Sequence, residues 1–196
     1  MRALALGACA LAALAFTACG GGERQDADEP EGTFRMEVVD ATFPAEQSIA
    51  ERATLKIAVR NADDKAIPNV AVTIATEPRQ PGGAPVAFAQ NRDDPSLADP
   101  SRPVWILDRG PEGGETAYTN TWSLGAMEAG ETRTFEWRVT AVQAGEYTIG
   151  YQVSPGLDGK AKLAGGGGAG SFRVSIDDAP PGARIAADGE TVVREK

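Results

Sequence analysis

The residue types that usually carry out catalysis are scarce in this sequence. Its 196 residues include no histidine, so neither a Ser-His-Asp nor a Cys-His arrangement can form. Zinc, copper and non-haem iron sites nearly always use His or Cys, and the chain has only Cys9 and Cys19. No serine stands in a recognisable nucleophile motif. We therefore expect no catalytic residue, no metal site and no cofactor.

Carboxylates are the one abundant reactive group, with 28 acidic against 19 basic side chains and a net charge of −9. This charge argues against nucleic-acid binding, which needs a basic surface. Calcium needs only oxygen ligands, but Asp93, Asp94, Asp99 and Asp108 lack the spacing of a calcium loop, and solvated turn acids are the simpler interpretation. Two carboxylates can hydrolyse a glycosidic bond, yet the sequence singles out no pair.

Cys19 has the clearest assignment. Arg2 precedes an apolar run over residues 3–16, which is shorter than the roughly twenty residues of a membrane span and is typical of a signal peptide. The next residues, Phe16-Thr17-Ala18-Cys19-Gly20, resemble the bacterial lipobox, with Phe16 where that family normally has Leu. The resemblance implies a signal peptide over residues 1–18 and an acyl anchor, such as palmitate, on Cys19.

The segment after Cys19 is acidic and has no large apolar residue. It reads GGGERQDADEPEG over residues 20–32, so we predict a flexible spacer over residues 19–33. The expected location is outside the cytoplasm, with the lipid holding the domain to the cell membrane. Ordinary secretion with cleavage near Ala18 is the alternative, and it would leave Cys19 unexplained.

Apolar and polar residues alternate along seven segments of the remaining chain. The alternation gives each segment one buried and one wet face, as in antiparallel sheets. The 23 glycines and 13 prolines argue against a helical bundle. We therefore predict an all-β fold, an antiparallel β-sandwich of about seven strands over residues 34–178. The seven segments lie at 34–38, 55–60, 70–74, 122–124, 135–139, 147–153 and 172–176.

Residues 77–119 depart from this pattern because they are rich in Pro, Gly and Asp. A loop of this length inside a compact domain is usually functional or disordered, so we interpret it as an insertion carrying one or two edge strands. Trp105 and Tyr118 lie within it and are candidate contact residues, since Trp and Tyr often anchor a partner or a sugar. A Trp in a long loop also commonly caps the edge of a core.

Three weaker local signals complete the chain. Asp188-Gly189 between two short apolar runs predicts a C-terminal hairpin over residues 179–196. The run Gly165–Gly168 predicts a mobile linker between the last two strands of the sandwich, because it leads into a strand pattern and not into a helix. The stretch Glu46–Arg52 allows one helical turn.

Three motifs point to a fold family. Residues 55–74 read as two strands with Asn61 closing the first, residues 124–132 read L-G-A-M-E-A-G-E-T, and residues 144–149 read A-G-E-Y-T-I. These resemble the Ig-like domains of bacterial surface proteins called CARDB and DUF11, with Ala129 in place of their usual Pro. The resemblance implies an Ig-like sandwich, no catalytic residue, and a tyrosine corner at Tyr147 whose hydroxyl bonds back to the chain.

Together these features predict a membrane-anchored, surface-exposed lipoprotein with a non-catalytic binding or structural role at the bacterial cell envelope. The expected partners are the membrane, through the N-terminal lipid, and an envelope protein or glycan that contacts residues 77–119. The alternative is an envelope hydrolase or carbohydrate-binding accessory protein that uses carboxylates and exposed aromatics. Two acids facing each other across a concave pocket, at least one with a perturbed pKa, would favour that alternative.

Overall fold

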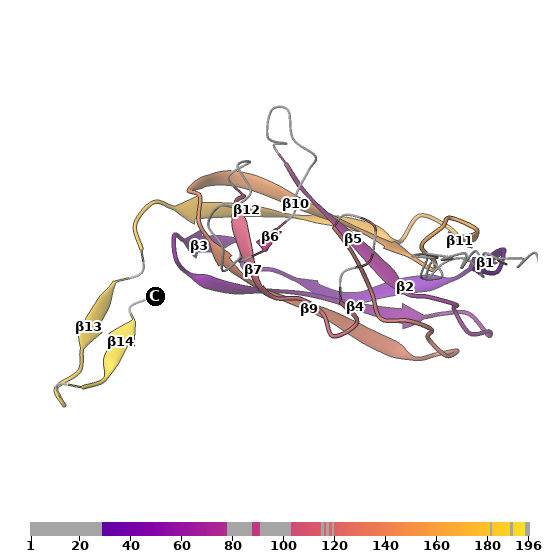
Figure 1. Ribbon diagram of the computed structural model, residues 1–196, viewed down its shortest axis with the longest axis horizontal. Helices are drawn as coiled ribbons and strands as arrows, with labels where there is room; N and C mark the ends of the chain where they lie inside the picture. The colour runs from indigo at the N-terminus through magenta and orange to yellow at the C-terminus, as the bar shows by residue number, and fades with distance from the viewer. Residues whose placement is uncertain are drawn as a thin grey trace, which may run out of the picture.

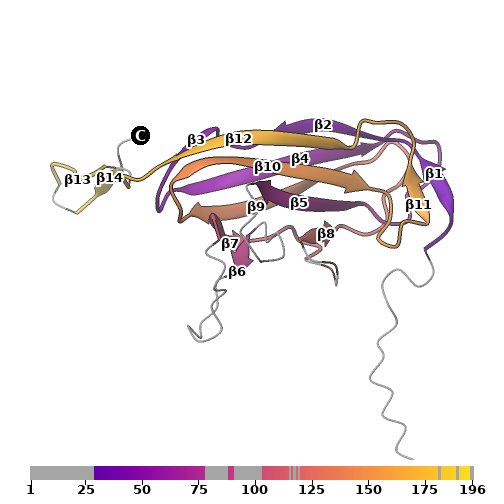
Figure 2. The same cartoon turned by 90° about the horizontal axis from the view of Figure 1, so that it is seen from above.

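The protein is a β-sandwich. In the computed structural model, the described residues form strands and turns without a helix, and most strands belong to two five-stranded sheets packed face to face (Figures 1 and 2). The predicted all-β sandwich is therefore confirmed. None of the described residues belongs to a helix long and apolar enough to span a membrane. The structure describes residues 29–77, 88–90, 103–114, 116, 118, 120–180, 182–188 and 190–194. The predicted signal peptide, Cys19 and much of the 77–119 insertion lie outside these residues.

The first sheet is built around two ten-residue strands, β4 (Arg52–Asn61) and β9 (Thr132–Ala141), which pair antiparallel along their length. The strand order is β2-β4-β9-β7-β6. The four longest strands occupy the places of strands A, B, E and D of an Ig domain. The strands that flank β4 and β9 are β2 (Met36–Thr42) on one side, and β7 (Trp105–Arg109) and then β6 (Ala89–Gln90) on the other. Strands β6 and β7 are the two strands expected of the insertion; β6 is the edge strand, and β7 lies between it and β9.

The second sheet has the order β3-β12-β10-β5-β8. Its three long strands occupy the places of C, F and G of an Ig domain. They are β5 (Ala71–Glu77), β10 (Gly145–Ser154) and β12 (Ala169–Asp177). At its far edge lies β8 (Thr121–Ser123), which pairs with β5.

The helical turn allowed over Glu46–Arg52 does not form. The chain crosses from the first sheet to the second after β2, and β3 (Glu46–Ser48) pairs parallel with the end of β12. The Ser175 N–H donates to the Ala45 carbonyl at 2.8 Å, and the Ile49 N–H donates to the Asp177 carbonyl at 3.0 Å. These bonds to a distant strand outweigh a local preference that only one turn could satisfy.

The core lies between the sheets and follows directly from the alternation in the sequence. Every second residue of β4 and β9 points inward, and the inward aliphatic and aromatic side chains in the middle of both strands are fully buried. Aromatic rings join the sheets: Trp122 and Trp137 meet edge to face at 5.5 Å, and Trp137 stacks on Phe135 at 5.7 Å. The fully buried residues of the two strands are Leu55, Ile57, Val59, Phe135, Trp137 and Val139.

A small two-stranded sheet closes one end of the sandwich. It pairs β1 (Gly32–Phe34) in parallel with β11 (Ala161–Leu163), a strand that the sequence did not predict. The described part of the chain begins at Glu29, just before β1. The C-terminal end of the predicted spacer over residues 19–33 therefore belongs to the folded domain. Gly168 is also buried, and its carbonyl accepts the Val153 N–H at 2.7 Å, so it packs instead of serving as a free linker.

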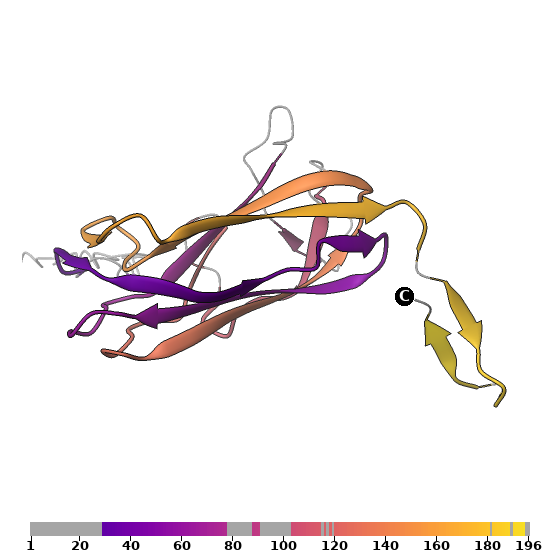
Figure 3. The ribbon, with the colours of Figure 1, turned by 180° about the vertical axis from the view of Figure 1, so that it is seen from behind.

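The predicted C-terminal hairpin is present at the opposite end. It pairs β13 (Ala183–Ile185) with β14 (Val192–Arg194) and extends beyond the sandwich, away from β1 and β11 (Figures 1 and 3). At its turn, Asp188 accepts hydrogen bonds from the Glu190 and Thr191 N–H groups and from the Thr191 hydroxyl. These bonds, the Thr191 hydroxyl first, lower the pKa of Asp188 to about 2.

Candidate binding site

A difference in strand length opens a groove at the edge of the first sheet. Strand β7 covers only the final part of β9, pairing with residues 138–141, and then turns away at Gly110. Residues 132–137 of β9 have no strand on that side among the described residues. The chain after β7 forms a turn over residues 110–114. This turn packs so closely against β8 that a Cβ added at Gly113 would overlap the Ser123 carbonyl.

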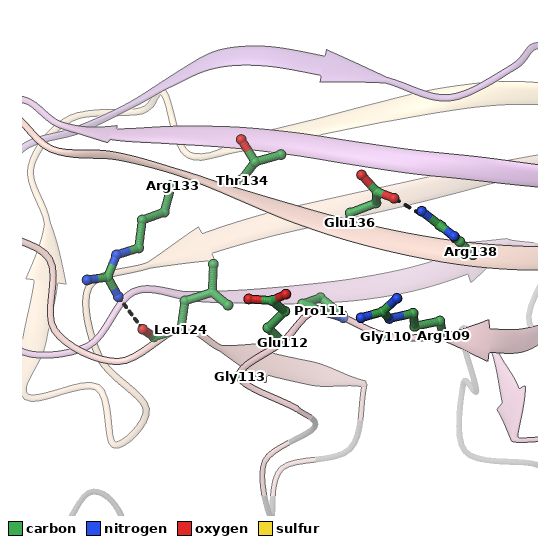
Figure 4. Close-up of a pocket in the computed structure, with 10 residues that line it drawn as sticks. All are labelled: Arg109, Gly110, Pro111, Glu112, Gly113, Leu124, Arg133, Thr134, Glu136 and Arg138. Carbon is green, nitrogen blue, oxygen red and sulfur yellow. Dashed lines mark hydrogen bonds and ion pairs between the residues drawn. The ribbon is translucent and has the colours of Figure 1, made fainter.

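Between this turn and β9 lies an open groove of about 760 Å³. Figure 4 shows the Glu112 carboxylate rising from the turn toward β9, with Arg133 on one side and Arg109 and Arg138 on the other. Leu124 contributes to the floor, and Thr134 and Glu136 project from β9. The groove is therefore lined by three arginines and two glutamates in a chain whose net charge is −9.

The three charged residues of β9 are all held by neighbours. The Glu136 carboxylate lies 3.2 Å from Arg138 Nε and 3.6 Å from Lys56 Nζ on β4. Arg133 donates from Nε to Glu131 at 2.7 Å and from Nη1 to the Leu124 carbonyl, which closes one end of the groove. These contacts fix two guanidinium groups along the groove, each beside one carboxylate.

Arg109 and Glu112 are not engaged in this way. Neither side chain forms a hydrogen bond or ion pair with another described residue, and both residues are exposed and line the groove. A ligand with its own polar and charged groups can pair with these two side chains without first breaking a contact inside the protein.

Glu136 does not have the raised pKa that a glycosidase general acid needs. A general acid needs a carboxyl group with a raised pKa. The hydrogen bond from Arg138, together with attraction from Lys56, instead lowers the pKa of Glu136. No group of three His, Cys, Asp or Glu residues that could hold a metal ion occurs among the described residues. Asp108 accepts the Thr140 hydroxyl at 2.7 Å, whereas Asp93, Asp94 and Asp99 lie outside the described residues.

Trp105, expected as a contact residue, has its side chain fully buried. Its Nε1–H donates to Gln47 Oε1 at 2.8 Å, and its ring meets Phe43 and Tyr147 edge to face. Because β7 belongs to the first sheet, its first residue points into the core and is not available to a partner. Tyr118 is 37% exposed and lies beyond the groove-forming turn.

Tyr147 makes the bond that the tyrosine-corner interpretation requires. Its hydroxyl donates to the Ala144 carbonyl at 3.0 Å, at the corner that leads into β10. Gly145 sits beneath the ring with φ of 138°, where an added Cβ would lie 3.1 Å from the hydroxyl. Tyr147 thus stabilises the fold at one end and lies apart from the groove.

The sequence analysis did not predict the groove residues. Arg109 and Glu112 fall in the insertion, whose path could not be predicted. Arg133 did carry a signal, because it occupies an inward position of β9, in step with Phe135 and Trp137. A charge at an inward position near a strand end suggests a site where the sandwich is open.

Comparisons with known proteins concern the fold. No family model matches the chain, and no curated protein matches it by sequence. A CARDB domain from Pyrococcus furiosus, in complex with di-metal ions, is 16% identical with a TM-score of 0.46, over 74% of this chain and 96% of that one. Alpha-2-macroglobulin from Escherichia coli is 14% identical with a TM-score of 0.44, over 80% of this chain and 21% of that one. Beta-glucosidase from Listeria innocua, in complex with glucose, is 14% identical with a TM-score of 0.39, over 74% of this chain and 16% of that one.

Proposed function

We propose that the chain is a lipoprotein of the bacterial cell envelope, anchored through Cys19, whose sandwich binds an envelope protein without catalysis. The observation that carries the binding role is the polar groove beside the uncovered edge of β9. The lipobox-like residues and the acidic segment after them support export and anchoring.

The arrangement of the chain ends suits a tethered domain. The N-terminal segment enters at β1, and the C-terminal hairpin extends from the opposite end (Figure 3). A lipid on Cys19 would therefore place the β1 end nearer to the membrane. The hairpin end would point away from it.

A protein partner suits the groove better than a glycan. Glycan-binding sites usually present exposed aromatic rings, but Trp105 is buried, Trp122 and Trp137 belong to the core, and the exposed Tyr118 does not line the groove. The groove instead offers charged side chains and an uncovered strand edge, which are features that recognise a polypeptide.

Lipidation can be tested with a matched pair of cysteine variants. The chain is expressed in a bacterium supplied with an alkyne analogue of palmitate, and its label and membrane location are measured. The wild-type chain and Cys9→Ser should carry the label and sediment with membranes, whereas Cys19→Ser should carry none, because Cys9 lies in the predicted signal peptide. Label on Cys19→Ser, or an unlabelled wild-type chain in the soluble fraction, would contradict the anchor.

A further inference from the structure

From the backbone of β9 we infer that its uncovered edge binds an extended acidic segment of a partner protein as an added strand. This inference rests on the proposed binding function and specifies the partner for the same groove. It is argued from three observations: the direction of the peptide groups of β9, the length of the uncovered edge, and the charges beside it.

The peptide groups that face the groove can be identified from neighbouring hydrogen bonds. Ala141 exchanges backbone bonds with the residues preceding β4, donating to Glu51 at 3.1 Å and accepting from Ala50 at 2.8 Å. Val142 instead donates to Val104 beside β7, at 2.9 Å. Peptide groups alternate sides along an antiparallel strand, so odd residues of β9 face β4 and even residues face the β7 side.

Where β7 is absent, the even residues face the groove. Thr132, Thr134 and Glu136 therefore direct their N–H and C=O groups toward the uncovered edge. A sheet edge of this kind is a template for pairing with another chain. The uncovered stretch spans six residues, 132–137, which corresponds to a strand of about 20 Å, a common strand length in proteins.

The outer strand on the other side of the same sheet is protected. Strand β2 carries a bulge between Val38 and Asp40, a common device that prevents pairing with another chain. Residues 132–137 contain neither a proline nor a bulge in their pairing with β4. The edge beside the groove is therefore regular, and no strand of the described part of the chain pairs with it.

The charges favour an acidic partner. Arg109 has no ion pair with a described residue, and Arg138 shares Glu136 with Lys56. The groove is lined by three arginines and two glutamates, one of them the equally unpaired Glu112, so it has an excess of one cationic side chain in a chain that carries −9 overall. A segment with Asp or Glu near its ends can pair with Arg109 and Arg138, while a basic segment would meet both arginines at close range.

The test uses two fluorescent peptides of alternating valine and threonine, one with acidic ends and one with lysine ends. Binding to the full chain in detergent is followed by fluorescence anisotropy. The acidic peptide should bind about tenfold or more tightly than the lysine peptide, and the difference should shrink in high salt. Arg109→Gln should reduce this difference. Equal binding of both peptides, or binding of neither, overturns the inference.

A backbone variant tests strand addition itself. Thr134→Pro removes the N–H that faces the groove, whereas Thr134→Val keeps it and is also β-branched. Thr134→Pro should weaken binding about five- to tenfold, the effect of one lost hydrogen bond, and Thr134→Val should not. Because proline can disturb the strand, hydrogen exchange of the wild-type chain is measured as well. Bound peptide should protect the Thr134 and Glu136 amides, and protection at β2 instead overturns the inference.

The same variants separate this inference from the proposed function. The wild-type chain and Thr134→Pro are each crosslinked in the membrane of the bacterium that produces them, and the envelope proteins captured by the two are compared. If the same partner is captured equally by both, the binding function stands and the β9 edge is not its site. If neither peptide binds and no envelope protein is captured, both this inference and the proposed binding function fail.

Discussion

Asn61 is the buried polar side chain whose loss should be most informative. It closes β4, is fully buried, and links two turns that are distant in sequence. Its Nδ2 donates to the carbonyls of Lys65, Met127 and Glu128 at 2.9, 3.1 and 3.0 Å. Its Oδ1 accepts the Asp63 N–H at 2.9 Å. Every polar atom of the side chain is therefore satisfied inside the protein.

The energetic effect can be worked from these bonds. Asn61→Ala removes two N–H donors and one acceptor, and at about 1 kcal/mol for each the free energy of unfolding should fall by about 3 kcal/mol. For a domain of this size, that corresponds to a fall in Tm of roughly 6 to 12 °C. Asn61→Asp should be worse, because its carboxylate faces three carbonyl oxygens without a cation, and an unpaired buried charge costs about 3 to 5 kcal/mol.

Thermal and urea unfolding, followed by tryptophan fluorescence, measure both variants. Lys162→Ala, at an exposed position of β11, is the matched control and should change the free energy of unfolding by less than about 0.5 kcal/mol. The reasoning is refuted if Asn61→Ala has the same free energy of unfolding as the control, or if Asn61→Asp is as stable as Asn61→Ala.

Three further predictions concern the ends of the sandwich. Burial raises the pKa of Glu29, but hydrogen bonds from the backbone N–H groups of the 157–161 turn outweigh it and hold this pKa below its ordinary value of 4.5. Its stabilising effect should thus be complete above pH 4.5 and lost as the pH falls through the lower folded-state value, so Glu29→Gln should be destabilising at pH 7 in urea unfolding and less destabilising at pH 3; an equal difference at both pH values would contradict this. Gly156→Ala should act on the same contact, because a Cβ there would overlap the Glu29 carboxylate, so a double-mutant cycle should show that the double variant is no less stable than the worse single variant. Trp105→Phe should lower the free energy of unfolding by about 1 to 3 kcal/mol in urea, since it leaves the buried Gln47 carbonyl without its donor, and an unchanged value would contradict that role.

The sequence predicted those parts of the fold where one face of a strand is apolar along its whole length. Strands β4 and β9 are the clearest cases, because their alternation is unbroken over ten residues. Strands β3 and β11 were missed, since each has only three residues and exists through pairing with a distant partner. No local pattern of three residues can specify a parallel partner more than a hundred residues away.

The site was harder to predict than the fold. A groove forms because β7 is shorter than β9, and the length of β7 depends on where Gly110 and Pro111 turn the chain. Trp105 is a candidate contact residue by its place in the insertion, with capping of a core edge as the alternative; its strand joins the first sheet and buries it, which agrees with the alternative. The type of residue was therefore less informative than the strand to which it belongs.

The contact at Glu29 has a mechanical consequence. The Glu29 carboxylate accepts the Leu157, Asp158 and Ala161 N–H groups at 2.5, 2.9 and 2.8 Å, immediately before β1. Tension pulling on the N-terminal segment would act first on these bonds and on the three residue pairs of β1, and only later on β2 and the core. The Glu29 hydrogen bonds and the β1–β11 pairing would therefore break before the sandwich unfolds. Release of residues 29–35 would lengthen the N-terminal segment by about 20 Å or slightly more. The domain would then meet a sudden pull with added reach and an intact fold.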